Sequence, residues 1–130
     1  MKQHSPGFLA IVGEAKKRIH EIDIEEYKRM VATGTAGQLV DVREDREYEA
    51  AHAAGAIHLS KGIIERDIEK VFPDKETQLV LYCGGGYRSA LATDNIQKMG
   101  YSNVLSLDGG WRAIEASGLP LEIPSTKEPT

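Results

Sequence analysis

The positions of apolar residues along the chain predict an alternation of strands and helices. Two runs, 38–42 (QLVDV) and 77–83 (TQLVLYC), are almost continuously apolar and have the length of strands. Shorter runs at 56–60 (AIHLS) and 103–107 (NVLSL) predict two more strands. Strands that are apolar on both faces are typical of parallel sheets covered by helices on both sides. We therefore expect an α/β fold built on a mostly parallel sheet.

Helical periodicity fills the intervals between these strands. Ser5 and Pro6 predict the start of a first helix, whose apolar positions continue to Ile19 and could pack on the domain or serve a dimer. Asp23 predicts the cap of a second helix, and Gly34 its end. Further helices are predicted at 45–55, 61–72, 89–100 and 110–118.

Composition narrows the class of protein. A chain of 130 residues has the usual size of one domain. Its 16 basic and 20 acidic residues give a net charge of −4, which argues against nucleic-acid binding. No apolar run approaches the roughly 20 residues of a membrane span. One cysteine cannot form an internal disulfide, and no signal peptide is evident, so we expect a reducing, cytoplasmic setting. The oligomeric state stays open.

The only cysteine, Cys83, ends the strand predicted at 77–83. Ligands of open parallel sheets bind beyond the carboxyl ends of the strands. Three glycines follow, and their unshielded amides, next to a helix N-terminus, can form an anion-binding nest that favours the nucleophilic thiolate. The sequence therefore predicts Cys83 as a catalytic nucleophile. The loop expected to bind the substrate comprises Gly84, Gly85, Gly86, Tyr87, Arg88 and Ser89.

Arg88 falls in the first turn of the predicted helix, where the macrodipole opposes a cation. A bound anion, the Cys83 sulfur or a nearby carboxylate could compensate it, and the sequence leaves these alternatives open.

A buried, inert cysteine beside a tight turn is the structural alternative to a catalytic Cys83. The loop has no lysine followed by Ser or Thr, as a nucleotide-binding loop would, and the histidines are scattered. We expect no metal and no organic cofactor.

Four stretches, taken in order, resemble the rhodanese family of sulfurtransferases. They are LVDVRE (39–44), EYEAAHAAGAIHL (47–59), CGGGYRSA (83–90) and LDGGWRAIEASGLPLE (107–122). The resemblance implies a rhodanese-like fold over residues 19–122, with a five-stranded, mostly parallel sheet and helices on both faces. Residues 1–18 would then be an added N-terminal helical extension, and 123–130 a flexible tail.

The resemblance also implies a reaction. Cys83 would take a sulfane sulfur from thiosulfate or a similar donor, hold it as a persulfide and pass it to a thiol or to cyanide. Small sulfur-containing anions and thiol acceptors are thus the expected partners. Asp41 and Arg43 would lie near the end of their strand and support the loop, and Tyr87 is a candidate for the mouth of the pocket.

Two features of the loop distinguish between chemistries. Gly84 and Gly85 stand where family members that use thiosulfate often carry a cation, and Lys61 or Arg66 could replace it. The C-x4-R spacing is shorter than the C-x5-R of tyrosine phosphatases, which favours sulfur over phosphate. The alternatives are a non-enzymatic persulfide carrier or interaction module and, less favoured, a cysteine-dependent phosphatase or arsenate reductase-like enzyme.

Overall fold

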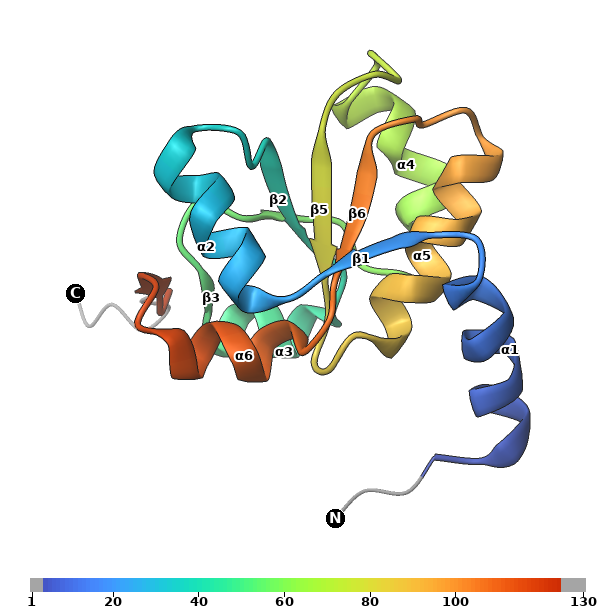
Figure 1. Cartoon of the computed structure of the whole chain (residues 1–130), viewed down its shortest axis with the longest axis horizontal. Coiled ribbons are helices and arrows are strands. Elements are labelled where there is room, and N and C mark those ends of the chain that lie inside the picture. Colours follow the sequence, from blue (N-terminus) through green and yellow to red (C-terminus); the bar gives the residue numbers. More distant parts are fainter. Residues whose placement is uncertain (1–3, 125–130) are drawn as a thin grey trace, which may run out of the picture.

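The computed structural model describes residues 4–124 and shows a five-stranded sheet between two layers of helices (Figure 1). The strand order is β1-β6-β5-β2-β4, and every neighbouring pair is parallel. These strands are β1 (His20–Ile22), β2 (Gln38–Asp41), β4 (Ile57–His58), β5 (Leu79–Tyr82) and β6 (Val104–Leu107). The expected α/β class, the parallel five-stranded sheet and the extra N-terminal helix are confirmed. Most of the expected tail, 123–130, lies outside the described residues.

Helices cover both faces of this sheet. They are α1 (Pro6–Lys16), α2 (Ile24–Thr33), α3 (Asp45–Ala50), α4 (Ile64–Val71), α5 (Tyr87–Lys98) and α6 (Gly110–Ser117). Figure 1 shows α4 and α5 on one face, α2 and α6 on the other, and α1 packed against α5. Within residues 4–124, no helix is long and apolar enough to cross a bilayer.

The central strand β5 explains the continuously apolar run. Leu79, Leu81 and the following Cys83 point into the core under α4 and α5. Val80 and Tyr82 point into the second core, under α2 and α6. Since both faces of β5 are buried, no polar position alternates with the apolar ones. The same geometry places the Cys83 side chain on the α5 side of the sheet.

Local capping residues define the starts of the first two helices, and the end of α2, as predicted. Ser5 caps α1 and accepts a hydrogen bond from the N–H of Phe8 at 3.4 Å. Asp23 caps α2 and accepts from the N–H of Glu26 at 2.8 Å. Gly34 ends α2 in the left-handed region, with φ of 75°. These contacts span only three or four residues, so the sequence predicts them well.

Three short strands were not predicted. β1 follows α1, which ends at Lys16 rather than at Ile19. The helix predicted at 45–55 ends at Ala50, because β3 (His52–Ala53) pairs antiparallel with β7 (Leu121–Glu122) in a separate two-stranded sheet. Strands of two or three residues show no period of their own, and their pairing depends on contacts distant in sequence.

Candidate active site

A pocket of about 1000 Å³ includes Cys83 in its wall, at the carboxyl end of β5. The loop after β5, the first turns of α3, α5 and α6, and the segment around the start of α1 all contribute to it. Its lining comprises His4, Phe8, Glu44, Arg46, Glu47, Cys83, Gly84, Gly85, Tyr87, Arg88, Asp108, Gly109 and Arg112. The structure therefore gathers most of the predicted loop around the only cysteine.

Backbone N–H groups surround the sulfur of Cys83. The amide of Gly86 donates to Sγ at 3.2 Å and that of Ser89 at 3.3 Å. Gly86 adopts a φ of 113°, a left-handed conformation that a residue with a side chain rarely takes. The side chain of Cys83 is buried, but it is not enclosed by hydrocarbon alone. Such donors, at the N-terminus of a helix, stabilise negative charge on sulfur.

Two hydroxyl groups continue this network below the sulfur. The Ser89 hydroxyl lies 3.6 Å from Sγ, and it lies 2.8 Å from the hydroxyl of Ser106 on β6. Both serines are completely buried. Ser106 was not singled out in the sequence, because only the packing of α5 on β6 brings it to the site.

The start of α6 holds the carbonyl side of the loop. Its N–H groups donate to the carbonyl oxygens of residues 83–85 and draw these oxygens away from the sulfur. The pairs are Trp111 N with Cys83 O at 2.6 Å, Arg112 N with Gly84 O at 3.2 Å and Gly109 N with Gly85 O at 3.2 Å. Since a carbonyl oxygen repels an anion, this pairing leaves the N–H side of the loop for the sulfur.

Arg88 is compensated by a carboxylate. Its guanidinium donates to both oxygens of Glu47 on α3, at 2.9 and 3.3 Å. The hydrogen bond from Arg88 lowers the pKa of Glu47 from 4.5 to about 2, and the same bond raises the pKa of Arg88. Of the three alternatives left open above, the structure selects the carboxylate, and the pair connects α3 to α5.

Two arginines that were not predicted from the sequence also line the pocket, Arg46 at the start of α3 and Arg112 in α6. Neither forms an ion pair with another of residues 4–124. Arg112 Nη1 lies 2.5 Å from the position that a Cβ on Gly85 would take, so the glycine leaves room for the guanidinium. The position of Arg112 beside the Gly-Gly-Trp stretch was the available signal.

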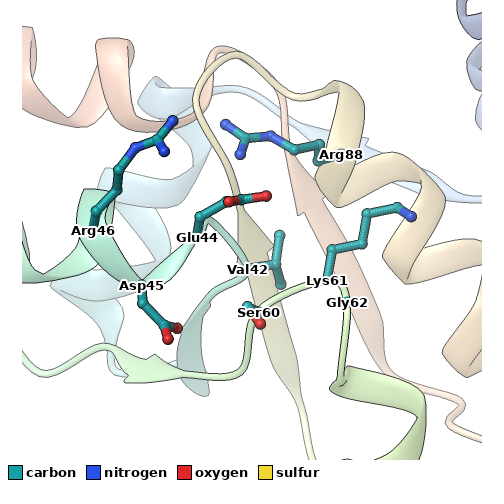
Figure 2. A pocket seen from close by; sticks show the side chains of 8 residues that line it. All are labelled: Val42, Glu44, Asp45, Arg46, Ser60, Lys61, Gly62 and Arg88. Carbon is teal, nitrogen blue, oxygen red and sulfur yellow. The ribbon is translucent and has the colours of Figure 1, made fainter.

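The two cations considered from sequence lie elsewhere. Lys61 lines a neighbouring pocket of about 560 Å³, which shares Glu44, Arg46 and Arg88 with the first (Figure 2). Figure 2 shows Arg46 and Arg88 extending toward each other above Glu44. Arg66 is exposed on α4, where it pairs with its neighbour Asp67 at 2.8 Å and lines neither pocket.

Asp41 and Arg43 form a buried ion pair, at 2.8 Å, on the other side of β5 from the sulfur. Burial alone would lower the pKa of Arg43, but the hydrogen bonds and charge of Asp41 outweigh it and raise that pKa. The guanidinium lies 4.5 Å from the ring centroid of Trp111. The backbone N–H of Trp111 in turn donates to the Cys83 carbonyl oxygen. The pair thus touches the loop through Trp111 and does not reach the sulfur.

His52 lies outside both pockets. Its Nδ1 lies 2.9 Å from the carbonyl oxygen of Tyr48, and its Nε2 lies 3.0 Å from a carboxylate oxygen of Glu122. His58 is likewise held by the carbonyl of Arg43, at 2.8 Å. Between residues 4 and 124, no three His, Cys, Asp or Glu side chains are placed to hold a metal ion.

Comparison with known proteins identifies relatives of two kinds, one described as a candidate carrier and the other as an enzyme. YrkF of Bacillus subtilis, described as a candidate sulfur carrier protein, is 30% identical over 99 residues. This match covers 76% of the chain but 52% of YrkF, so the chain spans about half of that relative. The thiosulfate sulfurtransferase GlpE of Coxiella burnetii is 35% identical over 78 residues, which are 60% of the chain and 71% of GlpE. Both relatives are named for carrying or transferring sulfur.

A solved structure extends the likeness to almost the whole chain. It belongs to a protein of unknown function from Rhodopseudomonas palustris, described as a possible tyrosine phosphatase. The two chains are 30% identical with a TM-score of 0.81, over 94% of this chain and 99% of the other. The family defined by the rhodanese-like domain matches residues 23–117, from the cap of α2 to the end of α6. The chain therefore belongs to the rhodanese-like domain family.

Proposed function

We propose that the protein is a sulfurtransferase that moves a sulfane sulfur from thiosulfate or a similar donor to a thiol through a persulfide on Cys83. One observation carries this proposal: the N–H groups of Gly86 and Ser89 point at the Cys83 sulfur, in the wall of a pocket that Arg46 and Arg112 also line. An ionised sulfur and an anionic donor are both stabilised by this arrangement.

The first half-reaction uses the Cys83 thiolate as nucleophile. It attacks the outer sulfur of thiosulfate, a bond forms between Sγ and that sulfur, and the sulfur–sulfur bond of thiosulfate breaks. Sulfite leaves with the electron pair. The product is a persulfide anion, whose charge the amides of the loop can stabilise in the same way as that of the thiolate.

The second half-reaction returns the enzyme to its starting state. A thiolate or cyanide attacks the outer sulfur of the persulfide and takes it, and the Cys83 thiolate leaves with the electron pair. Small sulfur-containing anions and thiols are thus the proposed partners. A lone cysteine that must stay reduced between turnovers fits the cytoplasm best.

Intact-mass measurement after incubation with thiosulfate tests the proposal directly. We expect the protein to gain one sulfur atom, cyanide to remove it with release of thiocyanate, and the variant Cys83→Ser to gain none. Absence of an adduct with thiosulfate and with organic thiosulfonates would overturn the proposal. Hydrolysis of p-nitrophenyl phosphate that depends on Cys83 would assign phosphate chemistry to the pocket instead.

A persulfide carrier is the second candidate function. Gly84 and Gly85 supply no side-chain charge immediately after Cys83, and a relative is described as a candidate sulfur carrier. A carrier would load one sulfur but turn over slowly with thiosulfate and cyanide. We expect an enzyme to show parallel lines in double-reciprocal plots for the two substrates, as ping-pong kinetics requires. Full persulfide loading without steady-state thiocyanate release would favour the carrier.

A further inference from the structure

The N-terminal segment supplies an aromatic surface to the Cys83 pocket, although it lies outside the residues that the family matches. The rings of His4, Phe8 and Tyr87, here called the aromatic wall, form a cluster in the lining. The ring centroids are 4.9 Å apart for His4 and Tyr87, 5.2 Å for His4 and Phe8, and 6.1 Å for Phe8 and Tyr87. An inorganic sulfur anion such as thiosulfate has no apolar group that would pack on three aromatic side chains.

This wall is held in place by the packing of α1 on α5 (Figure 1). Val12 and Ala15 are buried, with 3% and 1% of their surface exposed. Arg18 forms a two-pronged ion pair with Asp94 of α5, at 2.9 and 2.8 Å. Because α1 is anchored at this end, its first turn presents Phe8 to the pocket.

Charged groups complete the lining. Arg46 and Arg112 have no ion-pair partner among residues 4–124, whereas the acidic groups are in part compensated. Glu47 binds Arg88, and Asp108 lies 4.0 Å from Lys16. Glu44 is the remaining carboxylate in the lining. The pocket thus offers both an apolar surface and cations available to an anion.

The volume of the pocket also favours a ligand larger than thiosulfate. Pockets for organic molecules commonly measure about 300–1,000 Å³. At about 1000 Å³, this pocket would remain mostly empty around thiosulfate, with the aromatic wall uncovered. A donor with an organic group would fill it.

We propose that the pocket selects an organic anion carrying sulfane sulfur, with an aromatic or similar flat apolar group that packs on the aromatic wall while its anionic group faces Arg46 and Arg112. This inference rests on the proposed function and names its substrate class. With a thiosulfonate, the Cys83 thiolate bonds to the outer sulfur, the bond from that sulfur to the sulfonyl sulfur breaks, and the sulfinate leaves with the electron pair.

Kinetics with three donors tests this substrate class: thiosulfate, methanethiosulfonate and benzenethiosulfonate, each with cyanide as acceptor. We expect the wild type to show a higher kcat/KM for the benzene compound than for the methane compound. A ring packed on aromatic side chains adds about 0.5–1.5 kcal/mol beyond its buried area. Phe8→Ala should therefore lower the benzene-to-methane ratio of kcat/KM by about two- to twelvefold.

Two further variants keep the test independent of folding. His4→Ala removes another part of the wall ahead of the helix cap, and it should also lower the ratio. Leu9→Ala is the matched control on the same helix, because Leu9 is 44% exposed and does not line the pocket; the ratio should not change. A wild type without preference, or a ratio that Phe8→Ala and His4→Ala leave intact, would overturn the inference alone. If Cys83 accepts sulfur from none of the three donors, the proposed function itself fails.

Discussion

Three groups lie within 3.6 Å of the Cys83 sulfur: the backbone amides of Gly86 and Ser89, which donate to it, and the Ser89 hydroxyl, to which the protonated thiol donates. When the sulfur is ionised, Ser89 can donate to it and accept from Ser106. When the sulfur carries a proton, both hydroxyls can turn the other way. The serine pair can therefore follow the state of the sulfur by rotating two hydroxyl hydrogens, without moving heavier atoms.

Removal of the Ser89 hydroxyl should slow the reactions of Cys83. One hydrogen bond contributes about 1 kcal/mol, so Ser89→Ala should lower the rate constant for alkylation by iodoacetamide at neutral pH about fivefold. The matched control is Ser106→Ala, which keeps the hydroxyl next to the sulfur and should retain most of the rate. Equal rates in the wild type and Ser89→Ala would show that the amides alone stabilise the thiolate.

The Glu47–Arg88 pair should make stability depend on acid pH. The pKa of Glu47 is about 2 in the fold against an ordinary value of 4.5, so the unfolded chain binds the proton more tightly. The stabilisation is fully present above about pH 4.5 and is lost as the pH falls toward 2. The side chains are 32% and 31% exposed, so after solvent screening we expect about 1 kcal/mol.

Urea unfolding of the wild type and Glu47→Gln across this pH range provides the measurement. The difference in the free energy of unfolding should be constant near neutral pH and shrink below about pH 4.5. A difference that persists unchanged to the acid end would contradict the ionic origin of the stabilisation.

At the scale of elements, the loop after β5 and the start of α6 behave as one unit. Three backbone amides at the start of α6 donate hydrogen bonds to three carbonyl oxygens of the loop. Gly110 makes this possible, since it has φ of 49° and a Cβ on it would overlap the Cys83 carbonyl oxygen. The orientation of the loop amides toward the sulfur therefore depends on a glycine far from the cysteine in sequence.

Gly110→Ala should consequently damage both stability and the site. Left-handed strain costs about 1–3 kcal/mol, and the overlap with Cys83 adds to it. Gly118→Ala is the control, because Gly118 has φ of 87° but open space around it. We expect thermal unfolding to show the larger loss for Gly110→Ala, and intact mass after thiosulfate to show reduced persulfide only there. Equal losses in the two variants would mean that the loop tolerates the displaced carbonyl.

At the scale of the whole molecule, the sheet separates two apolar cores. Ile68 of α4 belongs to the core on one face and Ile114 of α6 to the core on the other, and both are completely buried. Because they share no packing partners across the sheet, their contributions to stability should be independent.

Truncation of these two residues tests that independence. Ile68→Ala and Ile114→Ala should each lower the free energy of unfolding by about 2–5 kcal/mol. The double variant should lose the sum within about 0.5 kcal/mol. Urea unfolding monitored by circular dichroism measures all three, and a double variant that loses much less than the sum would show one coupled core.

Much of the fold could be read from local patterns. The apolar run of β5 and the caps Ser5 and Asp23 predict elements that the structure contains, since each depends on neighbours within a few residues. The strands β1, β3 and β7 escaped prediction, because two or three residues carry no periodicity and extended backbone there is stabilised only by a distant partner.

By itself, the sequence determined the parallel α/β architecture, the place of Cys83 at the end of the central strand and the glycines that expose amides after it. Only the tertiary structure decided which distant groups join the Cys83 site: Ser106, which binds the Ser89 hydroxyl, Arg112 in the pocket lining, and the aromatic residues that the N-terminal segment adds to that lining. The physical reason is the separation along the chain over which each interaction acts. Backbone preferences act between near neighbours in sequence, whereas charges, hydroxyls and rings meet through the packing of helices on a sheet.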